Sequence, residues 1–255
     1  MSANPPYLTA FGSSYSPPAA IVGGSGIYYH NSGDTLGVKY IPTASNLTQF
    51  GKSVDEAKRE ADIALFADQL SPHIVGAQGI EIKENGLAML LEHVPETARN
   101  NYRLESLERL TLMRDVSQAL TVLHQNNIMH GDISPENILY NMTSKGILGY
   151  ITDFGEARRI GIDTDFPGGT RHYQDPERQN GTVGYMNDVY SFGKVAQELL
   201  NSFLTIPNDN YFSLILQSQL QQSTSRVSSR PQMSRLSMLL EDTLNAEREL
   251  IRRAA

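Results

Sequence analysis

Apolar residues recur every three or four positions along a long segment in the middle of the chain. Over residues 104–125 they fall on one side of a helix: Leu107, Leu110, Met113, Val116, Leu120 and Leu123. A similar spacing predicts further helices over residues 53–70, 188–202 and 235–253. Residues 217–229, dense in Gln and Ser, predict a loop or a weak helix.

Short apolar runs bounded by turn residues occupy the first part of the chain. Residues 27–29 and 37–41 flank a turn sequence at 31–34, which is the pattern of a β-hairpin. Residues 87–91 are an apolar run between a glycine and a proline, as in a buried strand. Strands therefore come first and helices later, without regular βαβ alternation, and this order predicts an α+β fold.

The composition argues against several classes of protein. With 255 residues, 40% of them hydrophobic, the chain can form a sizeable core. A net charge of −7 argues against a nucleic-acid partner, which needs a basic face. The chain has no cysteine, and therefore no disulfide or thiolate zinc site. No apolar run reaches the length of about 18 residues that a membrane span needs. We expect residues 1–19, with four prolines, to be a flexible tail without a signal peptide.

One short stretch carries the strongest chemical signal. Asp132 is followed five residues later by Asn137 and 21 residues later by the first residue of the sequence Asp153-Phe154-Gly155. Phosphoryl transfer from Mg-ATP needs a carboxylate to orient the acceptor hydroxyl, and a carboxamide and a second carboxylate to hold magnesium. This set of residue types in this order therefore predicts phosphoryl transfer.

The same stretch resembles the catalytic and metal-binding loops of eukaryotic-type protein kinases, in a divergent and compact form. The resemblance implies a bilobal kinase-like domain over residues 20–255, with a β-rich N-lobe at about 20–92 and a mostly helical C-lobe at about 93–255. It implies ATP and Mg²⁺ as cofactors. Asp132 would be the base, Asn137 and Asp153 the metal ligands, and His130 a structural residue.

The resemblance also implies which residues hold the nucleotide. Lys39 would contact the phosphates and pair with a helix glutamate, either Glu60 or, one turn earlier, Glu56. The remaining candidates are a glycine-rich phosphate loop, hinge residues at the adenine edge and one residue under the adenine: Gly23, Gly24, Gly26, Glu92, Val94 and Leu139. The loop departs from the family pattern at its first glycine and at Tyr28.

Two further departures fall inside the catalytic loop. Gly131 stands where an arginine usually follows the histidine, so activation by phosphorylation of the activation segment is less expected. Ser134 stands where serine/threonine kinases have a lysine that steadies the transferring phosphate, and we expect it to be one of the catalytic residues. The His-Gly-Asp form is similar to that of aminoglycoside phosphotransferases and choline kinases, which act on small molecules.

The C-terminal half favours a protein substrate. Residues 169–177 resemble the substrate-docking segment of protein kinases, with the hydroxyl of Thr170 expected to bond Asp132. Asp188 would hold the catalytic loop, and Arg230 would form a buried ion pair with Glu177.

We therefore expect a protein kinase of serine/threonine type with a protein substrate. The alternatives are a pseudokinase that binds without turnover and a small-molecule kinase. The expected location is the cytoplasm, or a host cytosol if the chain is a delivered bacterial effector. Autophosphorylation at Thr164, Thr170 or Tyr173 is a further hypothesis.

Overall fold

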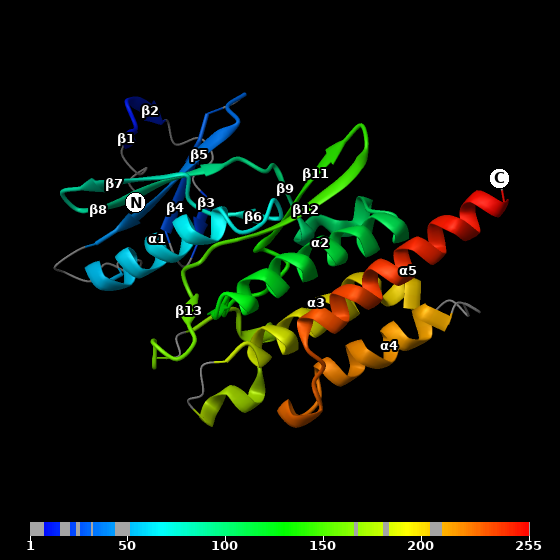
Figure 1. Cartoon of the computed structure of the whole chain (residues 1–255). Coiled ribbons are helices and arrows are strands. Elements are labelled where there is room, and N and C mark those ends of the chain that lie inside the picture. The colour runs from blue at the N-terminus through cyan, green and yellow to red at the C-terminus, as the bar shows by residue number, and fades with distance from the viewer. Residues whose placement is uncertain are drawn as a thin grey trace. The chain divides into compact units, whose positions relative to one another are not determined.

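The computed structural model describes residues 8–15, 21–23, 26–31, 33–43, 52–165, 168–180, 184–204 and 211–254. The chain forms two compact units. The N-terminal unit contains Met1–Leu70, Val75–Val94 and Asp153–Gly155. The C-terminal unit contains Ser71–Ile74, Pro95–Thr152 and Glu156–Ala255. The first is rich in strands and the second in helices (Figure 1), so the predicted α+β fold class is confirmed.

The N-terminal unit is built on a five-stranded antiparallel sheet of order β3-β4-β5-β8-β7. Its strands are β3 (Ile21–Gly23), β4 (Gly26–His30), β5 (Leu36–Pro42), β7 (Gly79–Lys83) and β8 (Gly86–Glu92). β5 lies in the middle, and its Lys39 is opposite Tyr28 on β4 and Met89 on β8. A central strand is the most firmly held part of a sheet, so Lys39 starts from a rigid backbone.

Helix α1 (Val54–Asp68) packs on β8 in the same unit. It begins with a capping box, in which Ser53 and Glu56 satisfy each other's backbone amides. Four alanines make up most of its buried face, which lets the helix approach its neighbours closely. At the helix end the amide of Ala77 donates to the carbonyl of Ala64 at 3.0 Å.

A small hairpin of β1 (Leu8–Ala10) and β2 (Ser13–Tyr15) covers part of the sheet. Ala10 is buried in a cluster with Tyr29, Val38 and Ala88. Successive strand residues point to opposite faces, so this cluster lies on the face away from Lys39. The hairpin falls within the predicted tail, residues 1–19, whose other residues are outside the described ranges except for Phe11 and Gly12 at the turn.

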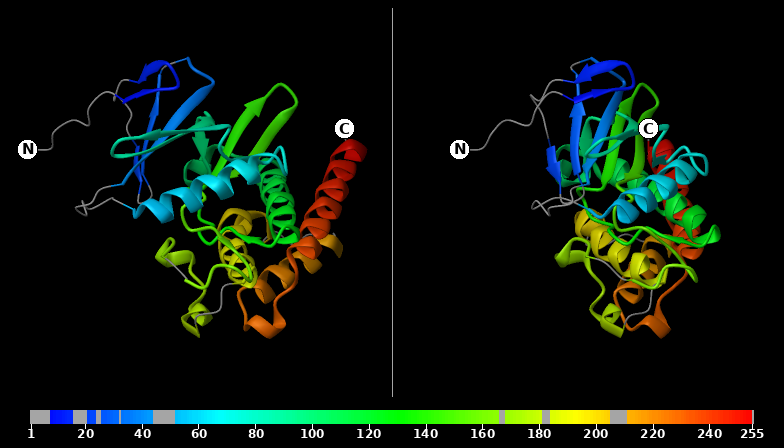
Figure 2. Two further views of the ribbon diagram at one scale, coloured as in Figure 1. Left: turned by 60° about the vertical axis from the view of Figure 1, so that its left-hand side comes forward. Right: turned by 90° about the vertical axis from the view of Figure 1, so that its left-hand side faces the viewer.

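The C-terminal unit is organised around helix α2 (Ser106–Gln125), which packs against α3 (Met186–Leu204) and α5 (Met233–Ala254). Figure 2 shows these helices from two further sides. The apolar stripe predicted from the sequence is buried here, with Leu110, Met113, Val116, Leu120 and Leu123 at 0% exposure. Helix α4 (Tyr211–Ser223) includes part of the predicted loop or weak helix, which ends in a 3₁₀ turn at Val227–Ser229.

Short strands frame the catalytic loop of this unit. Strand β10 (Ile128–Met129) precedes the loop and pairs with β13 (Arg158–Arg159), which follows the loop later in the chain. The hairpin of β11 (Ile138–Thr143) and β12 (Gly146–Thr152) begins where the loop ends. The hairpin belongs to a sheet of order β6-β12-β11-β9, with β6 at Ile74–Val75 and β9 at Glu96–Thr97. Further 3₁₀ turns lie at Ala98–Arg103, Arg171–Tyr173 and Pro176–Asn180.

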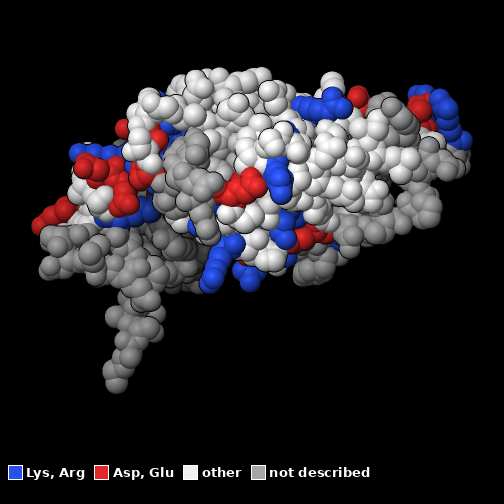
Figure 3. Space-filling view, turned by 90° about the horizontal axis from the view of Figure 1, so that it is seen from below, with Lys and Arg blue, Asp and Glu red and all other residues white. Residues whose placement is uncertain are grey.

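Acidic and basic side chains are mixed on the face drawn in Figure 3, and the described residues there form no continuous basic surface. The prediction that the chain binds no nucleic acid stays a prediction. Within the described part of the chain, the helices are all too short or too polar to cross a membrane.

Candidate active site

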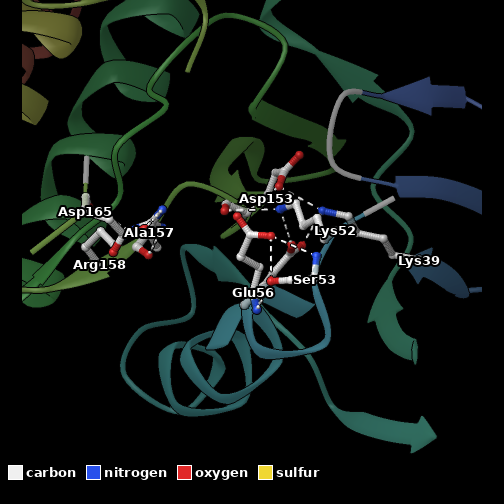
Figure 4. Close-up of polar contacts among 10 residues, drawn as sticks. Lys39, Lys52, Ser53, Glu56, Asp153, Ala157, Arg158 and Asp165 are labelled. Atoms are coloured by element: carbon white, nitrogen blue, oxygen red, sulfur yellow. Dashed lines mark hydrogen bonds and ion pairs between the residues drawn. The ribbon is translucent and has the colours of Figure 1, made fainter. Parts of the chain in front are cut away.

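The N-terminal unit gathers a cluster of buried charges around Lys39. The Lys39 ammonium lies 2.5 Å from Oε1 of Glu60 and 2.8 Å from Oδ1 of Asp153 (Figure 4). Burial alone would lower the pKa of Lys39, but the carboxylates of Asp153 and Glu60 more than offset it and raise the pKa above its ordinary value. The ammonium is therefore charged at neutral pH.

The structure pairs Lys39 with Glu60 rather than with Glu56. Glu60 points inward from α1 and is 2% exposed. Glu56 is engaged at the helix cap, where its Oε2 accepts the amide of Ser53 at 2.8 Å and the Ser53 hydroxyl at 2.7 Å. These hydrogen bonds lower the pKa of Glu56. Glu56, the alternative partner that the sequence left open, is thus bonded to Ser53 in the capping box.

Asp153 is held in an uncommon backbone conformation. Its φ is +68°, in the left-handed region that aspartate tolerates better than most residues. Its Oδ1 accepts the amide of Gly155 at 3.0 Å as well as the Lys39 ammonium. The side chain keeps 29% of its surface exposed, so the carboxylate can still reach a ligand.

Sequence reasoning missed a second lysine in this cluster. Lys52 lies 2.7 Å from the other oxygen of Glu60, Oε2, and 3.2 Å from the carbonyl oxygen of Gly155. Lys52 precedes the helix cap, so it belongs to no periodic pattern that would place it beside Glu60. No signal in the sequence pointed to it.

In the C-terminal unit, Asp132 is the centre of a separate group of contacts. Its Oδ1 accepts the backbone amide of Thr170 at 2.6 Å, and its Oδ2 accepts Nδ2 of Asn137 at 2.9 Å. Asn137 also donates to the carbonyl of Asp132. The structure therefore brings Asp132, Asn137 and Thr170 together, but through the amide of Thr170 and not the hydroxyl that was expected.

Asp188 holds the backbone that leads into Asp132. Its carboxylate accepts the amides of His130 and Gly131, each at 2.8 Å, and Nε2 of His124 lies 2.9 Å away. Burial would raise the pKa of Asp188, but the contacts with His124, His130 and Gly131 outweigh it and lower the pKa. His130 itself is buried, with Nε2 3.0 Å from the carbonyl of Thr152.

Gly131 cannot be exchanged for the arginine of the family pattern without a change of backbone. Its φ is +82°, and a Cβ there would lie 2.4 Å from the carbonyl oxygen of Glu156. Gly169 has a similar constraint, because its φ is +95° and a Cβ would lie 2.8 Å from the carbonyl oxygen of Gly131. Glycine at position 131, in place of the arginine, thus allows the backbone segments around it to approach each other closely.

The hydroxyl of Ser134 lacks a polar partner among the described residues, although the carbonyl of Ser134 accepts the amide of Asn137 at 3.1 Å. Ser134 is fully buried, and its Oγ makes no hydrogen bond within the described part of the chain. A buried hydroxyl without a partner is uncommon and costs free energy. The catalytic role expected for Ser134 stays a prediction.

The buried partner of Arg230 is Asp175, which corrects the ion pair expected with Glu177. Arg230 contacts both oxygens of Asp175, and both side chains are 0% exposed. Glu177 lies 3.8 Å away, half exposed, and accepts the amide of Val227 instead. The Arg230 guanidinium also lies over the ring of Tyr190, 5.1 Å from its centre.

The activation segment, residues 156–174, is tied together by its own side chains. Arg158 is almost fully buried and donates to the carbonyl of Ala157 at 2.7 Å. It also donates to the carbonyl and carboxylate oxygens of Asp165, each at 3.1 Å (Figure 4). Within the described residues of this segment, the carboxylate of Asp165 thus provides a negative charge that pairs with Arg158.

The predicted nucleotide residues lie at different places. Gly23 and Gly26 face each other at the β3–β4 turn, whereas Gly24 lies outside the described residues. Glu92 is the exposed last residue of β8, and Val94 is buried beyond it. Leu139 belongs to β11 of the C-terminal unit.

Tyr28, one of the departures from the family pattern, extends toward the hinge. Its hydroxyl lies 3.0 Å from Nδ1 of His93, and burial raises its pKa to about 12. A Cβ on Gly37 would collide with the Tyr28 hydroxyl at 2.0 Å, so the glycine makes room for the ring.

Comparison with known proteins decides the family. The protein kinase domain matches residues 25–250, which is most of the chain. The chain belongs to the protein kinase domain family. The recognition made from the catalytic-loop motifs is therefore confirmed.

Three relatives illustrate how far the similarity extends. The probable serine/threonine-protein kinase gdt4 of Dictyostelium discoideum is 30% identical over 58% of this chain and 10% of its own length. The probable serine/threonine-protein kinase CA_C1728 of Clostridium acetobutylicum is 28% identical over 76% of this chain and 31% of its own. Mitogen-activated protein kinase kinase 7 of Arabidopsis thaliana is 30% identical over 69% and 60%. The chain thus spans less than two thirds of the length of each.

Proposed function

We propose that this protein kinase domain transfers the γ-phosphate of Mg-ATP to a serine or threonine hydroxyl of a protein. The observation that carries the proposal is the buried contact of Lys39 with both Glu60 and Asp153. Active protein kinases need this lysine–glutamate pair and this aspartate in place. The printed names of the relatives support the serine/threonine class.

The residues present fit a nucleotide with a divalent metal. Asp153 and Asn137 would each offer an oxygen ligand of the kind that Mg²⁺ prefers, and such ions complete their shell with water and substrate phosphates. The described residues contain no group of three His, Asp or Glu side chains that would form a metal site without a nucleotide. Mg-ATP, when bound, would supply the phosphoryl group, and its magnesium ion would offset the negative charge of the phosphates.

The roles of the protein's own side chains follow from their chemistry. Lys39 provides a fixed positive charge for phosphate oxygens. Asp132 orients the acceptor hydroxyl and receives its proton, while the amide of Thr170 and the carboxamide of Asn137 hold its carboxylate in place. Gly23, Gly24 and Gly26 are proposed for the phosphate loop, Glu92 and Val94 for the hinge and Leu139 for the pocket floor, with lobes at about 20–92 and 93–255.

Radiolabelled ATP tests the proposal. The wild type with Mg²⁺ should label generic protein substrates and not aminoglycosides or choline, and EDTA should stop the labelling. Asp132→Ala should lower the rate by about 10²–10⁴-fold, as expected for loss of a general base. Asp62→Ala, which removes an exposed carboxylate from α1, is the matched control and should leave the rate unchanged.

Other outcomes would select the alternatives. Labelling of a small molecule alone would identify a small-molecule kinase, and ATP binding without transfer to any acceptor would identify a pseudokinase. The protein substrate, a cytoplasmic location and delivery into a host remain proposals, for which capture of host or cytosolic proteins by the Asp132→Ala variant is the first experiment.

A further inference from the structure

Lys52 closes a ring of contacts in the N-terminal unit. Lys39 bonds Oε1 of Glu60, and Lys52 bonds Oε2 of the same carboxylate at 2.7 Å. Lys52 continues to the carbonyl of Gly155 at 3.2 Å, and the amide of Gly155 returns to Asp153, which bonds Lys39. Figure 4 shows the side chains of Lys39 and Lys52 beside Asp153.

Most of the ring is shielded from solvent, although the Asp153 side chain keeps 29% of its surface exposed, and the charges of the ring balance. The side chains of Lys39, Lys52 and Glu60 are 11%, 14% and 1% exposed. The two ammonium groups match the two carboxylates of Glu60 and Asp153. Each oxygen of Glu60 has its own cation, so neither lysine replaces the other. Loss of Lys52 alone would leave one buried carboxylate oxygen and one carbonyl without their donor.

Lys52 is also the only member of the ring that joins α1 directly to the turn after Asp153. Its ammonium reaches the glutamate inside the helix and the backbone of the turn, while its own backbone precedes the helix cap at Ser53. The start of the helix, its buried glutamate and the metal-binding turn are thereby held by one side chain.

We infer that Lys52 is a positioning residue for phosphoryl transfer, which sets Glu60 and the Asp153–Gly155 turn in the arrangement that binds Mg-ATP. The inference rests on the proposed function. Lys52 is not a catalytic residue, because its contacts are to Glu60 and Gly155. It acts on Lys39 through the shared carboxylate and on Asp153 through the backbone of the turn.

Lys52→Met keeps most of the length of the side chain and removes its charge, and Lys52→Arg keeps the charge. Lys83→Met is the matched control, since Lys83 also pairs with a carboxylate of the same unit, Glu81 at 2.5 Å, but lies outside the ring. For each variant we would measure the thermal midpoint, kcat, ATP affinity by calorimetry, and the Mg²⁺ concentration that gives half-maximal nucleotide binding.

Lys52→Met should lower kcat by about tenfold or more, because a small misplacement of reacting groups is costly. It should also raise the Mg²⁺ concentration needed for nucleotide binding, which a loss of stability alone would not do. Lys52→Arg should recover most of both values, and Lys83→Met should match the wild type.

Wild-type kcat and Mg²⁺ dependence in Lys52→Met would overturn the inference. The same would follow if Lys83→Met lost as much, or if only the thermal midpoint changed. If the wild type transfers no phosphate, the proposed function fails, and the Mg²⁺ dependence of nucleotide binding alone decides the role of Lys52. A wild type that binds no nucleotide would refute both.

Discussion

Arg230 and Asp175 form a fully buried, bidentate ion pair that joins the residue directly after the activation segment to the chain after α4. The guanidinium also donates to the carbonyls of Ser225 and Met186, at 2.8 and 3.0 Å. Three separate stretches of the C-terminal unit are therefore held by one side chain.

Removal of either partner of this pair should destabilise the protein strongly. Arg230→Met leaves Asp175 charged and buried, and breaking such a pair costs about 3–5 kcal/mol. Glu177→Gln is the control, because Glu177 is half exposed and exposed pairs contribute at most about 1 kcal/mol. Denaturation in urea measures both losses. Equal losses for the two variants would contradict the assignment of Asp175 as the main partner.

Substitution of Gly131 separates backbone strain from collision. Gly131→Ala should cost about 1–2 kcal/mol for the left-handed backbone, and more for the contact with Glu156. Gly161→Ala has the matching φ of +84° with no atom within 4 Å of the new Cβ, so only the cost of the left-handed backbone applies there. Gly131→Ala should therefore be the less stable of the two in urea denaturation, and its transfer rate should fall because Asp132 follows directly. Identical stabilities would contradict the collision.

The contact between Arg158 and Asp165 should order the activation segment without phosphate. Asp165→Ala should speed proteolysis within residues 156–174 by about fivefold, which corresponds to a loss of about 1 kcal/mol. Thr164→Ala, a change at the neighbouring exposed residue, is the control.

Phosphate content of the wild type and of Asp132→Ala, compared by mass spectrometry, tests autophosphorylation at Thr164, Thr170 or Tyr173. Equal content would end that hypothesis.

His93 should make stability depend on pH. Burial and the neighbouring His30 lower the pKa of His93 below its ordinary value of 6.5, so the unfolded chain takes up the proton more readily. The contribution of His93 is complete above the unfolded pKa and decreases as the pH falls from there toward the folded pKa. Thermal midpoints between about pH 5 and 7.5 should therefore change less in His93→Gln than in the wild type. Parallel pH profiles would show that His93 has no such role.

The residues predicted from the sequence are those whose chemistry depends on short spacing. Asp132 and Asn137 lie within one loop, and the helix of residues 104–125 repeats its apolar residues over many turns, so both could be recognised without tertiary contacts. Lys52 could not, because its position beside Glu60 is set by the turn at Gly155, far away in the chain.

Asp175 shows a different reason for a wrong prediction. Two acidic residues stand two positions apart, and either could meet Arg230. Which of them is buried depends on how the 3₁₀ turn at Pro176–Asn180 directs the side chains. Within residues 1–19, which composition predicts to be a tail, residues 8–15 form a hairpin whose strands are too short to give an alternating pattern.

The hairpin has a practical consequence for work with this protein. Ala10 lies against Tyr29, Val38 and Ala88, and the amide of Phe11 donates to Glu81 at 2.6 Å. A recombinant protein trimmed to the family match, which starts at residue 25, would lose this cover and expose the apolar side chains beneath it to water. Poor solubility of such a protein would reflect the cut, and samples for enzymology should keep residues 8–15.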